Sequence, residues 1–79
     1  MVYFVRAMEM HRTSNRTFSP EVYCSDLPEA RDRAKCRVRE SAPDLMLQVD
    51  ACLRTNGHIV TKYRCRINRR GELHEYHLN

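Results

Sequence analysis

Six basic side chains within a short stretch of the chain could bind a phosphate or a carboxylate. Over residues 59–67, Lys62, Arg64 and Arg66 alternate with apolar or small side chains, which is the period of a β-strand with one polar face. Residues 45–71 carry six basic residues against one acidic residue, a local net charge of +5. This charge predicts a binding surface, which we call the basic row, made of Arg54, Lys62, Arg64, Arg66, Arg69 and Arg70.

The kind of partner follows from the kind of cation. The formal net charge is +4, and twelve of the fourteen basic residues are arginine, whose planar guanidinium group suits carboxylates and phosphates. We therefore expect an acidic protein surface or a DNA or RNA backbone as the partner. An ordinary solvated sheet face, for which Lys and Arg are common side chains, is the alternative interpretation.

Metal binding and catalysis are not indicated. Successive cysteines are separated by 11, 15 and 12 residues without a CxxC motif, and His74 and His77 would lie on opposite faces of a strand. Two glycines leave no phosphate-binding loop and no nucleophile elbow. A Cys/His pair that meets in space has no sequence signature, and nothing supports one here. We predict a non-enzymatic protein without metal or cofactor.

The elements that must position the basic row are two strands and their connection. Alternate apolar residues over 45–54 indicate a half-buried strand, and Thr55-Asn56-Gly57 indicates a hairpin. A two-residue turn would place the cations in the core, so we expect a three-residue loop. The expected pairs are Leu53 with Ile59, Val49 with Tyr63, Leu47 with Cys65, Leu45 with Ile67, and Asp50 with Lys62.

A helix is expected before this hairpin. Asp26 and Glu29 have the spacing of a capping box, Pro28 falls in the first turn, and Pro43 is expected to end the helix. A narrow stripe of apolar side chains would face the sheet, namely Leu27, Ala30, Ala34 and Val38. Cys36 lies roughly opposite this stripe, so it is the thiol that we expect to be exposed.

The remaining segments complete a small sheet. Residues 2–11 are rich in β-formers, with no decision on their buried face, and residues 11–17 are expected to turn the chain. Phe18, Val22 and Cys24 indicate a second strand, which Pro20 confines to an edge. Residues 73–78 can return as a short last strand, with Tyr76 set against Cys65 as one register.

Together these elements predict one α+β domain over residues 1–79. It is a twisted antiparallel sheet of four to five strands with one helix packed on one face, in the order ββαββ with an optional short last strand. Since Tyr63 points inward in the expected register, stacking of bases on the sheet is disfavoured, and backbone contact or an acidic protein surface fits better. The core is small, so both a monomer and a homodimer remain open.

The first ten residues, "MVYFVRAMEM", have only four apolar residues before Arg6. This run is too short for a signal-peptide core or a membrane span, so we expect a cytoplasmic protein without membrane contact. The four thiols are then expected to be reduced, with a disulfide-bridged secreted form as the alternative.

The layout of the chain resembles a known class of small proteins. Within 79 residues, a first hairpin precedes the capped helix "SDLPEARDRAKCRV" and the second hairpin "LMLQVDACLRTNGHIVTKYRCRI". This arrangement is similar to that of small phage-type anti-CRISPR proteins that act on type I CRISPR systems. The resemblance is one of topology, and those inhibitors share almost no sequence motif, so no functional residue carries over.

The resemblance implies a non-enzymatic inhibitor that docks on the multi-subunit surveillance complex and obstructs access of the guide or of target DNA. It also implies that a phage-encoded protein would act in the host-cell cytoplasm. Several such inhibitors are acidic DNA mimics, whereas this chain is basic. The implied contact is therefore an acidic patch on a subunit of the effector complex, or nucleic acid that the complex holds.

Overall fold

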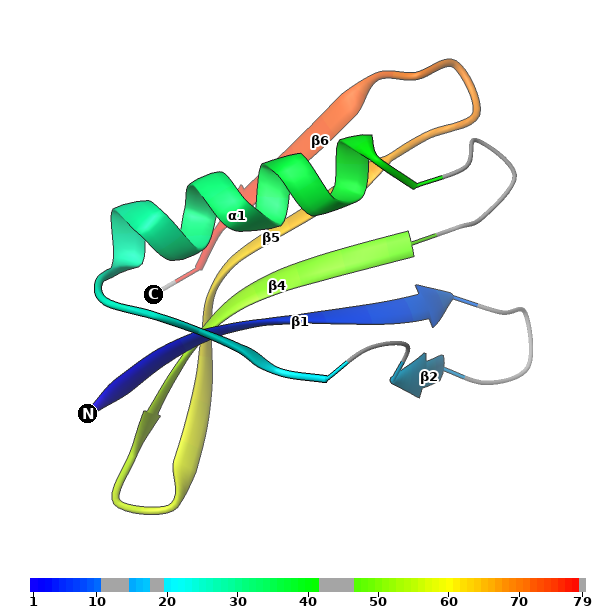
Figure 1. Cartoon of the computed structure of the whole chain (residues 1–79). Helices are drawn as coiled ribbons and strands as arrows, with labels where there is room; N and C mark the ends of the chain where they lie inside the picture. Colours follow the sequence, from blue (N-terminus) through cyan, green and yellow to red (C-terminus); the bar gives the residue numbers. More distant parts are fainter. Residues whose placement is uncertain (11–14, 18–19, 42–46, 79) are drawn as a thin grey trace.

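The computed structural model describes residues 1–10, 15–17, 20–41 and 47–78. Within them, six strands form one antiparallel sheet in the order β2-β1-β4-β5-β6, with β3 also pairing with β1, and one helix lies across one face (Figure 1). This confirms the predicted α+β class. The elements are β1 (Val2–Met10), β2 (Asn15–Thr17), β3 (Val22–Cys24), α1 (Leu27–Arg39), β4 (Leu47–Thr55), β5 (His58–Ile67) and β6 (Leu73–His77).

Two short strands, β2 and β3, lie between β1 and the helix in the sequence, and only β3 was expected. Residues 15–17, expected to be part of a turn, form β2 beside the end of β1. The second predicted strand appears as β3, which pairs with the beginning of β1 and starts after Pro20. Phe18 lies outside the described residues. Because β2 and β3 pair with opposite ends of β1, two short segments share one edge of the sheet.

The predicted helix is confirmed, including its N-terminal cap. The Asp26 carboxylate accepts a hydrogen bond of 2.9 Å from the backbone N–H of Glu29. The Glu29 carboxylate returns to the residue before the cap, accepting 2.6 Å bonds from the backbone N–H and the hydroxyl of Ser25. Both interactions satisfy groups at the helix start that have no partner within the helix. The helix ends at Arg39, and the expected stop at Pro43 lies outside the described residues.

The helix packs closely on the sheet because its inner stripe is small. Ala30, Ala34 and Val38 are fully buried, whereas Cys36 is exposed, as expected. The stripe joins Val5, Ala7, Leu47, Val49, Ala51, Tyr63 and Cys65 in one core cluster. Among the described residues, no helix has both the length and the apolar character needed to span a bilayer.

The β4–β5 hairpin has the turn that sequence reasoning rejected. Asn56 and Gly57 form a two-residue turn with φ angles of 48° and 80°, so that Leu53 lies opposite Val60. These left-handed conformations are the ones for which Asn-Gly is favoured in hairpins. The expected three-residue loop is therefore wrong, as is the pairing of Leu53 with Ile59. Leu45 lies outside the described residues, and Ile67 pairs with Leu73 of β6.

A β-bulge reconciles this turn with the burial pattern. Ala51 lies opposite Tyr63 while the next residue, Cys52, lies opposite Thr61, so Lys62 is an additional residue on β5. Beyond the bulge the register shifts by one residue, which pairs Val49 with Cys65 and Asp50 with Arg64, contrary to the expected partners Tyr63 and Lys62. Tyr63 and Cys65 remain buried on the helix side, as expected, although for a different reason.

Candidate functional site

The central strand β4 is buried on both of its faces. Leu47, Val49 and Ala51 face the helix, and the alternate residues Gln48, Asp50 and Cys52 face the other way, yet none of the six is more than 2% exposed. We call the side of the sheet opposite α1 the polar face. Its described side chains on β1, β4, β5 and β6 include Phe4, Arg6, Gln48, Asp50, Cys52, Arg64, Arg66, His74 and Tyr76.

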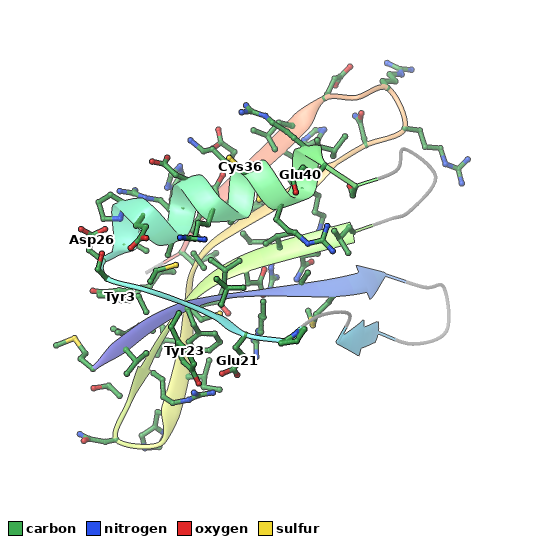
Figure 2. The ribbon with its side chains drawn as sticks, in the orientation of Figure 1. Tyr3, Glu21, Tyr23, Asp26, Cys36 and Glu40 are labelled. Carbon is green, nitrogen blue, oxygen red and sulfur yellow. The ribbon has the colours of Figure 1, made fainter. Side chains whose placement is uncertain are left out.

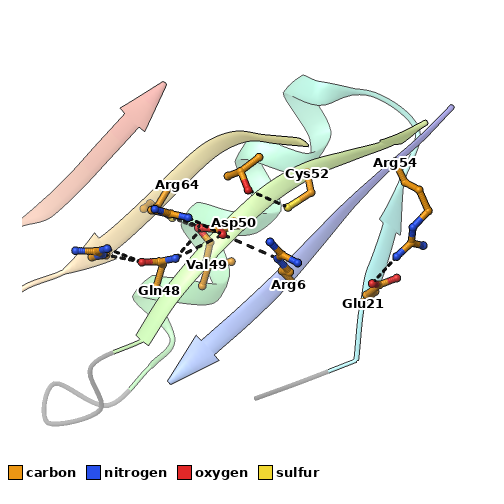
Figure 3. Close-up of polar contacts among 11 residues, drawn as sticks. Arg6, Glu21, Gln48, Val49, Asp50, Cys52, Arg54 and Arg64 are labelled. Atoms are coloured by element: carbon orange, nitrogen blue, oxygen red, sulfur yellow. Dashed lines mark hydrogen bonds and ion pairs between the residues drawn. The ribbon is translucent and has the colours of Figure 1, made fainter. Parts of the chain in front are cut away.

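Asp50 is at the centre of the polar face. Its carboxylate is 1% exposed and accepts two hydrogen bonds from Arg64, at 3.0 Å from Nε and 3.3 Å from Nη2 (Figure 3). Arg6, its neighbour on the other side, places Nε 4.0 Å from Oδ2. A buried carboxylate needs such partners because the loss of hydration is otherwise uncompensated. The hydrogen bonds to Asp50 raise the pKa of Arg64, so this guanidinium stays charged.

A second arginine is fixed through Gln48. Arg66 donates from Nε and Nη2 to Gln48 Oε1, at 2.9 and 2.6 Å, and the amide nitrogen of Gln48 lies 3.3 Å from Asp50 Oδ1. Gln48 is only 2% exposed, so it connects Arg66 to the buried carboxylate. Asp50 and Gln48 therefore hold Arg64 and Arg66 in defined positions, two residues apart on the same face of β5.

The positioned arginines remain accessible. The side chains of Arg64 and Arg6 are 32% and 29% exposed, and a guanidinium has five N–H donors. Arg64 directs Nε and Nη2 to Asp50, which leaves the donors of Nη1 for another acceptor. Arg6 Nε is buried and has no hydrogen-bond partner in the described part of the chain. The polar face thus combines fixed guanidinium groups with unused donors on Nη1 of Arg64, whereas Arg6 Nε is enclosed.

The basic row is divided by the structure into two groups. Arg64 and Arg66 are held as described, and Arg54 forms a 2.8 Å ion pair with Glu21 (Figure 3). The Arg54 guanidinium also lies 4.7 Å from the centre of the Phe4 ring. The sequence analysis placed these three arginines on an open sheet face and named no internal partners for them, whereas the structure gives each of them one. The hydrogen bond to Arg54 also lowers the pKa of Glu21. A role for these residues in partner binding stays a prediction.

The other three residues of the basic row lie at the bulge and in the turn after β5. Lys62 is the bulge residue, and Arg69 and Arg70 are exposed in the turn between β5 and β6. None of the three side chains forms an ion pair or hydrogen bond with another described residue. They are peripheral cations beside the anchored pair Arg64 and Arg66.

Two members of the polar face were missed by the sequence analysis. Arg6 lies directly opposite Asp50, and its parity with Phe4 on the first strand was visible but could not be assigned to a face. Tyr76 lies opposite Arg64, and the expected pairing of Tyr76 with Cys65 is wrong because Glu75 occupies that position. Tyr76 is 43% exposed, and the central carbon of the Arg66 guanidinium lies 5.8 Å from the centroid of its ring.

The helix side has its own polar contact, at the edge of the core. The Tyr63 hydroxyl donates a 2.6 Å hydrogen bond to Glu75, whose carboxylate also lies 3.2 Å from Lys35 of the helix. The bond from Tyr63, followed by that from Lys35, lowers the pKa of Glu75, whereas burial raises the pKa of Tyr63. This contact joins α1 to β5 and β6, which is a structural role.

Burial raises the pKa of three of the four thiols, those of Cys24, Cys52 and Cys65. All four cysteines are free, with Cys52 and Cys65 buried, and burial raises the pKa of Cys65 to about 11. A thiol with a raised pKa is a poor nucleophile at neutral pH. Across residues 1–10, 15–17, 20–41 and 47–78, no three His, Cys, Asp or Glu side chains are grouped as metal ligands.

A shallow groove runs between the outer side of the helix and β3. Glu21 and Tyr23 lie along the extended segment beside it, and Cys36 and Glu40 lie on the helix (Figure 2). Its lining has both charges, with Glu29, Asp32 and Glu40 beside Arg33 and Arg37, and a small apolar floor at Val5 and Val22. The mixed charge gives this groove no preference for one sign of ligand, in contrast to the polar face.

Comparison of the chain with protein-family models, with curated protein sequences and with solved structures finds no significant match. Any assignment of function therefore depends on the geometry of the molecule itself.

Proposed function

We propose that this protein is a small, non-enzymatic binding module whose polar face binds an anionic partner. The observation that supports this most is the fixing of Arg64 and Arg66 by Asp50 and Gln48, while both arginines stay only half-buried. An arginine that is already ordered loses less side-chain entropy on binding than a free one. With Arg6, the face offers three guanidinium groups around one buried carboxylate, a positive excess that complements phosphates or carboxylates.

Within this class, the proposed activity is inhibition of a type I CRISPR surveillance complex. Its support is the anti-CRISPR resemblance in size and order of elements, together with a basic surface that could contact an acidic patch on an effector subunit. Docking there would obstruct access of nucleic acid without any chemical step. The peripheral cations Lys62, Arg69 and Arg70 would extend the contact around the anchored pair.

The test must remove charge without disturbing the buried carboxylate. Reversing Arg64 is unsuitable, because it would leave Asp50 without its closest partner. The double variant Lys62→Gln, Arg66→Gln removes two charges and keeps both Arg6 and Arg64 beside Asp50. The matched control is Arg31→Gln, Arg39→Gln, which removes two charges from the helix.

We expect the first double variant to weaken binding of a purified type I complex at least about tenfold, equivalent to about 1.4 kcal/mol, and the control to bind like the parent protein. Binding is measured by surface plasmon resonance, and inhibition by the retention of target DNA. Equal binding by the two double variants would reject the polar face as the contact surface.

Nucleic acid is the second candidate partner, and the position of Tyr76 beside Arg66 favours it. Direct contact with phosphates releases counterions, so affinity for duplex DNA should fall with salt with a log-log slope of roughly −0.9 per phosphate neutralised. Absence of any complex with DNA or RNA at about 50 mM salt would reject this candidate and leave the protein partner.

A further inference from the structure

We infer that Tyr76, Arg64 and Arg66 form a subsite for one nucleotide of an unpaired nucleic-acid strand, with the base stacked on the tyrosine ring and the phosphate held by the guanidinium groups. The inference rests on the second candidate under the proposed function and adds the form of nucleic acid that the polar face would select.

The first support is the exposure of an aromatic ring on a charged surface. Tyr76 is 43% exposed, whereas Tyr63 on the neighbouring strand is fully buried in the core. Its side chain lies on the same face as Arg64, its cross-strand partner. In the described residues its only aromatic or cationic neighbour within ring-contact range is Arg66. The core does not need this ring, and a flat apolar surface among cations is what a base can stack on.

The second support is the distance between the ring and the cations. The guanidinium carbon of Arg66 lies 5.8 Å from the Tyr76 centroid, and Gln48 holds that guanidinium by two hydrogen bonds. Arg64, held by Asp50, lies on the adjacent strand opposite Tyr76. A base on the ring would therefore have its own phosphate beside donors that are already in place. Aromatic stacking combined with phosphate contacts is the general mode of single-strand recognition on sheets.

The third support is the position of Tyr76 at the border of the sheet. β6 is the last strand in the sheet order, so a strand of nucleic acid can approach the ring from the side. His74 lies on the same face, opposite Arg66, and adds a second ring to this border. In a duplex the base faces are already stacked within the helix and cannot lie on a protein ring without being extruded. The subsite therefore favours an unpaired strand.

The experiment compares Tyr76→Leu with Tyr76→Phe, which keeps the ring, and with Tyr23→Leu. Tyr23 is a matched control because it is a 61% exposed tyrosine on β3 whose neighbouring arginine, Arg54, is already paired with Glu21, the residue that accepts a hydrogen bond from the Tyr23 hydroxyl. Fluorescence anisotropy gives the affinities for a labelled single-stranded oligothymidylate, an oligouridylate, a DNA duplex of equal length, and inorganic polyphosphate as a competitor, at about 50 mM salt.

We expect the parent protein to bind single strands more tightly than the duplex. Tyr76→Leu should lose roughly 5- to 150-fold for single strands, the range for one stacked base, and change little for the duplex. Tyr76→Phe and Tyr23→Leu should retain single-strand affinity. The DNA and RNA oligomers separate a general single-strand subsite from one that requires the 2′-hydroxyl.

Two results would overturn the inference, and they differ in what they mean for the proposed function. If Tyr76→Leu binds single strands as well as the parent does, and polyphosphate still competes, the base subsite is wrong while the anionic-partner proposal stands. If no polyanion binds at all, both this subsite and the nucleic-acid candidate are rejected, and an acidic protein partner remains.

Discussion

The central strand β4 is buried on both faces of the sheet, but the two faces are covered in different ways. The helix side is covered by another element, α1, whose small stripe of Ala30, Ala34 and Val38 packs on apolar side chains. On the polar face, the long side chains of Arg64 and Arg66 lie beside Asp50 and Gln48. On the helix side, apolar side chains of α1 exclude water from β4. On the polar face, the methylene groups and the guanidinium groups of arginines cover β4.

This difference shows how a chain of 79 residues can bury a second face without a second layer. An arginine stem covers apolar area, and its head pairs with a carboxylate that would be costly to bury alone. The same arrangement leaves guanidinium donors at the surface. On the polar face, the residues that stabilise the fold are therefore the same ones that we propose for binding, whereas on the helix side they are not.

The largest effect is expected from breaking the ion pair on the polar face. Arg64→Ala leaves Asp50 with one cation, Arg6, at 4.0 Å, and with the amide of Gln48 at 3.3 Å. Loss of one partner of a buried pair destabilises proteins by about 3–5 kcal/mol, and we expect about 3 kcal/mol because Arg64 is partly exposed. Urea denaturation measures the change, with Arg39→Ala as the exposed control, expected within about 0.5 kcal/mol of the parent. A loss no greater than that of the control would mean that the pair does not hold this face together.

The next effect is expected on the helix side. Ala34 is fully buried between α1 and the sheet, so Ala34→Leu has to displace the helix or adopt an unfavourable rotamer. Overpacking of this kind typically destabilises by about 1–3 kcal/mol. Cys36→Leu introduces the same side chain at an exposed position of the same helix and should change the free energy of unfolding by less than about 0.5 kcal/mol. Equal effects at the two positions would contradict the close approach of helix and sheet.

The smallest effect concerns the contact of Glu75 with Tyr63 and Lys35. Its pKa is lowered from 4.5 in the folded protein, so its contribution to stability is present above pH 4.5 and is lost as the pH falls through the folded value. Glu75→Gln should therefore reduce the dependence of the urea midpoint on pH below 4.5. Glu40→Gln, at the exposed end of the helix, is the control. If the urea midpoint of Glu75→Gln depended on pH below 4.5 as it does in the parent protein, the Glu75 carboxylate would not make these contacts in solution.

The helix and the buried side of the sheet were predictable because their signals are local. The cap at Asp26 and the stripe ending at Val38 depend on residues a few positions apart, and the structure confirms both. The hairpin register was not predictable by the same means. Alternation over β5 was assumed to be unbroken, and a bulge at Lys62 allows the two-residue turn and the inward position of Tyr63 together.

The candidate site was less predictable than the fold. The alternation of Arg64 and Arg66 indicated one cationic face correctly, but it carried no information about the partners of these side chains. Asp50 read as an exposed residue of a half-buried strand, since its burial depends on arginines from two neighbouring strands. Tyr76 depended on the register of the last strand, which has few constraints in the sequence.

The most direct test of the central claim is an NMR measurement of the arginine Nε–H groups in the free protein and during titration with a polyanion. If Asp50 and Gln48 hold Arg64 and Arg66, the Nε–H signals of both should exchange slowly with water and should persist when the polyanion binds. The signals of these two arginines should also shift during the titration, whereas that of the exposed Arg39 should not. Fast-exchanging Arg64 and Arg66 signals, or an Arg64 signal that is lost on binding, would contradict an anchored arginine surface.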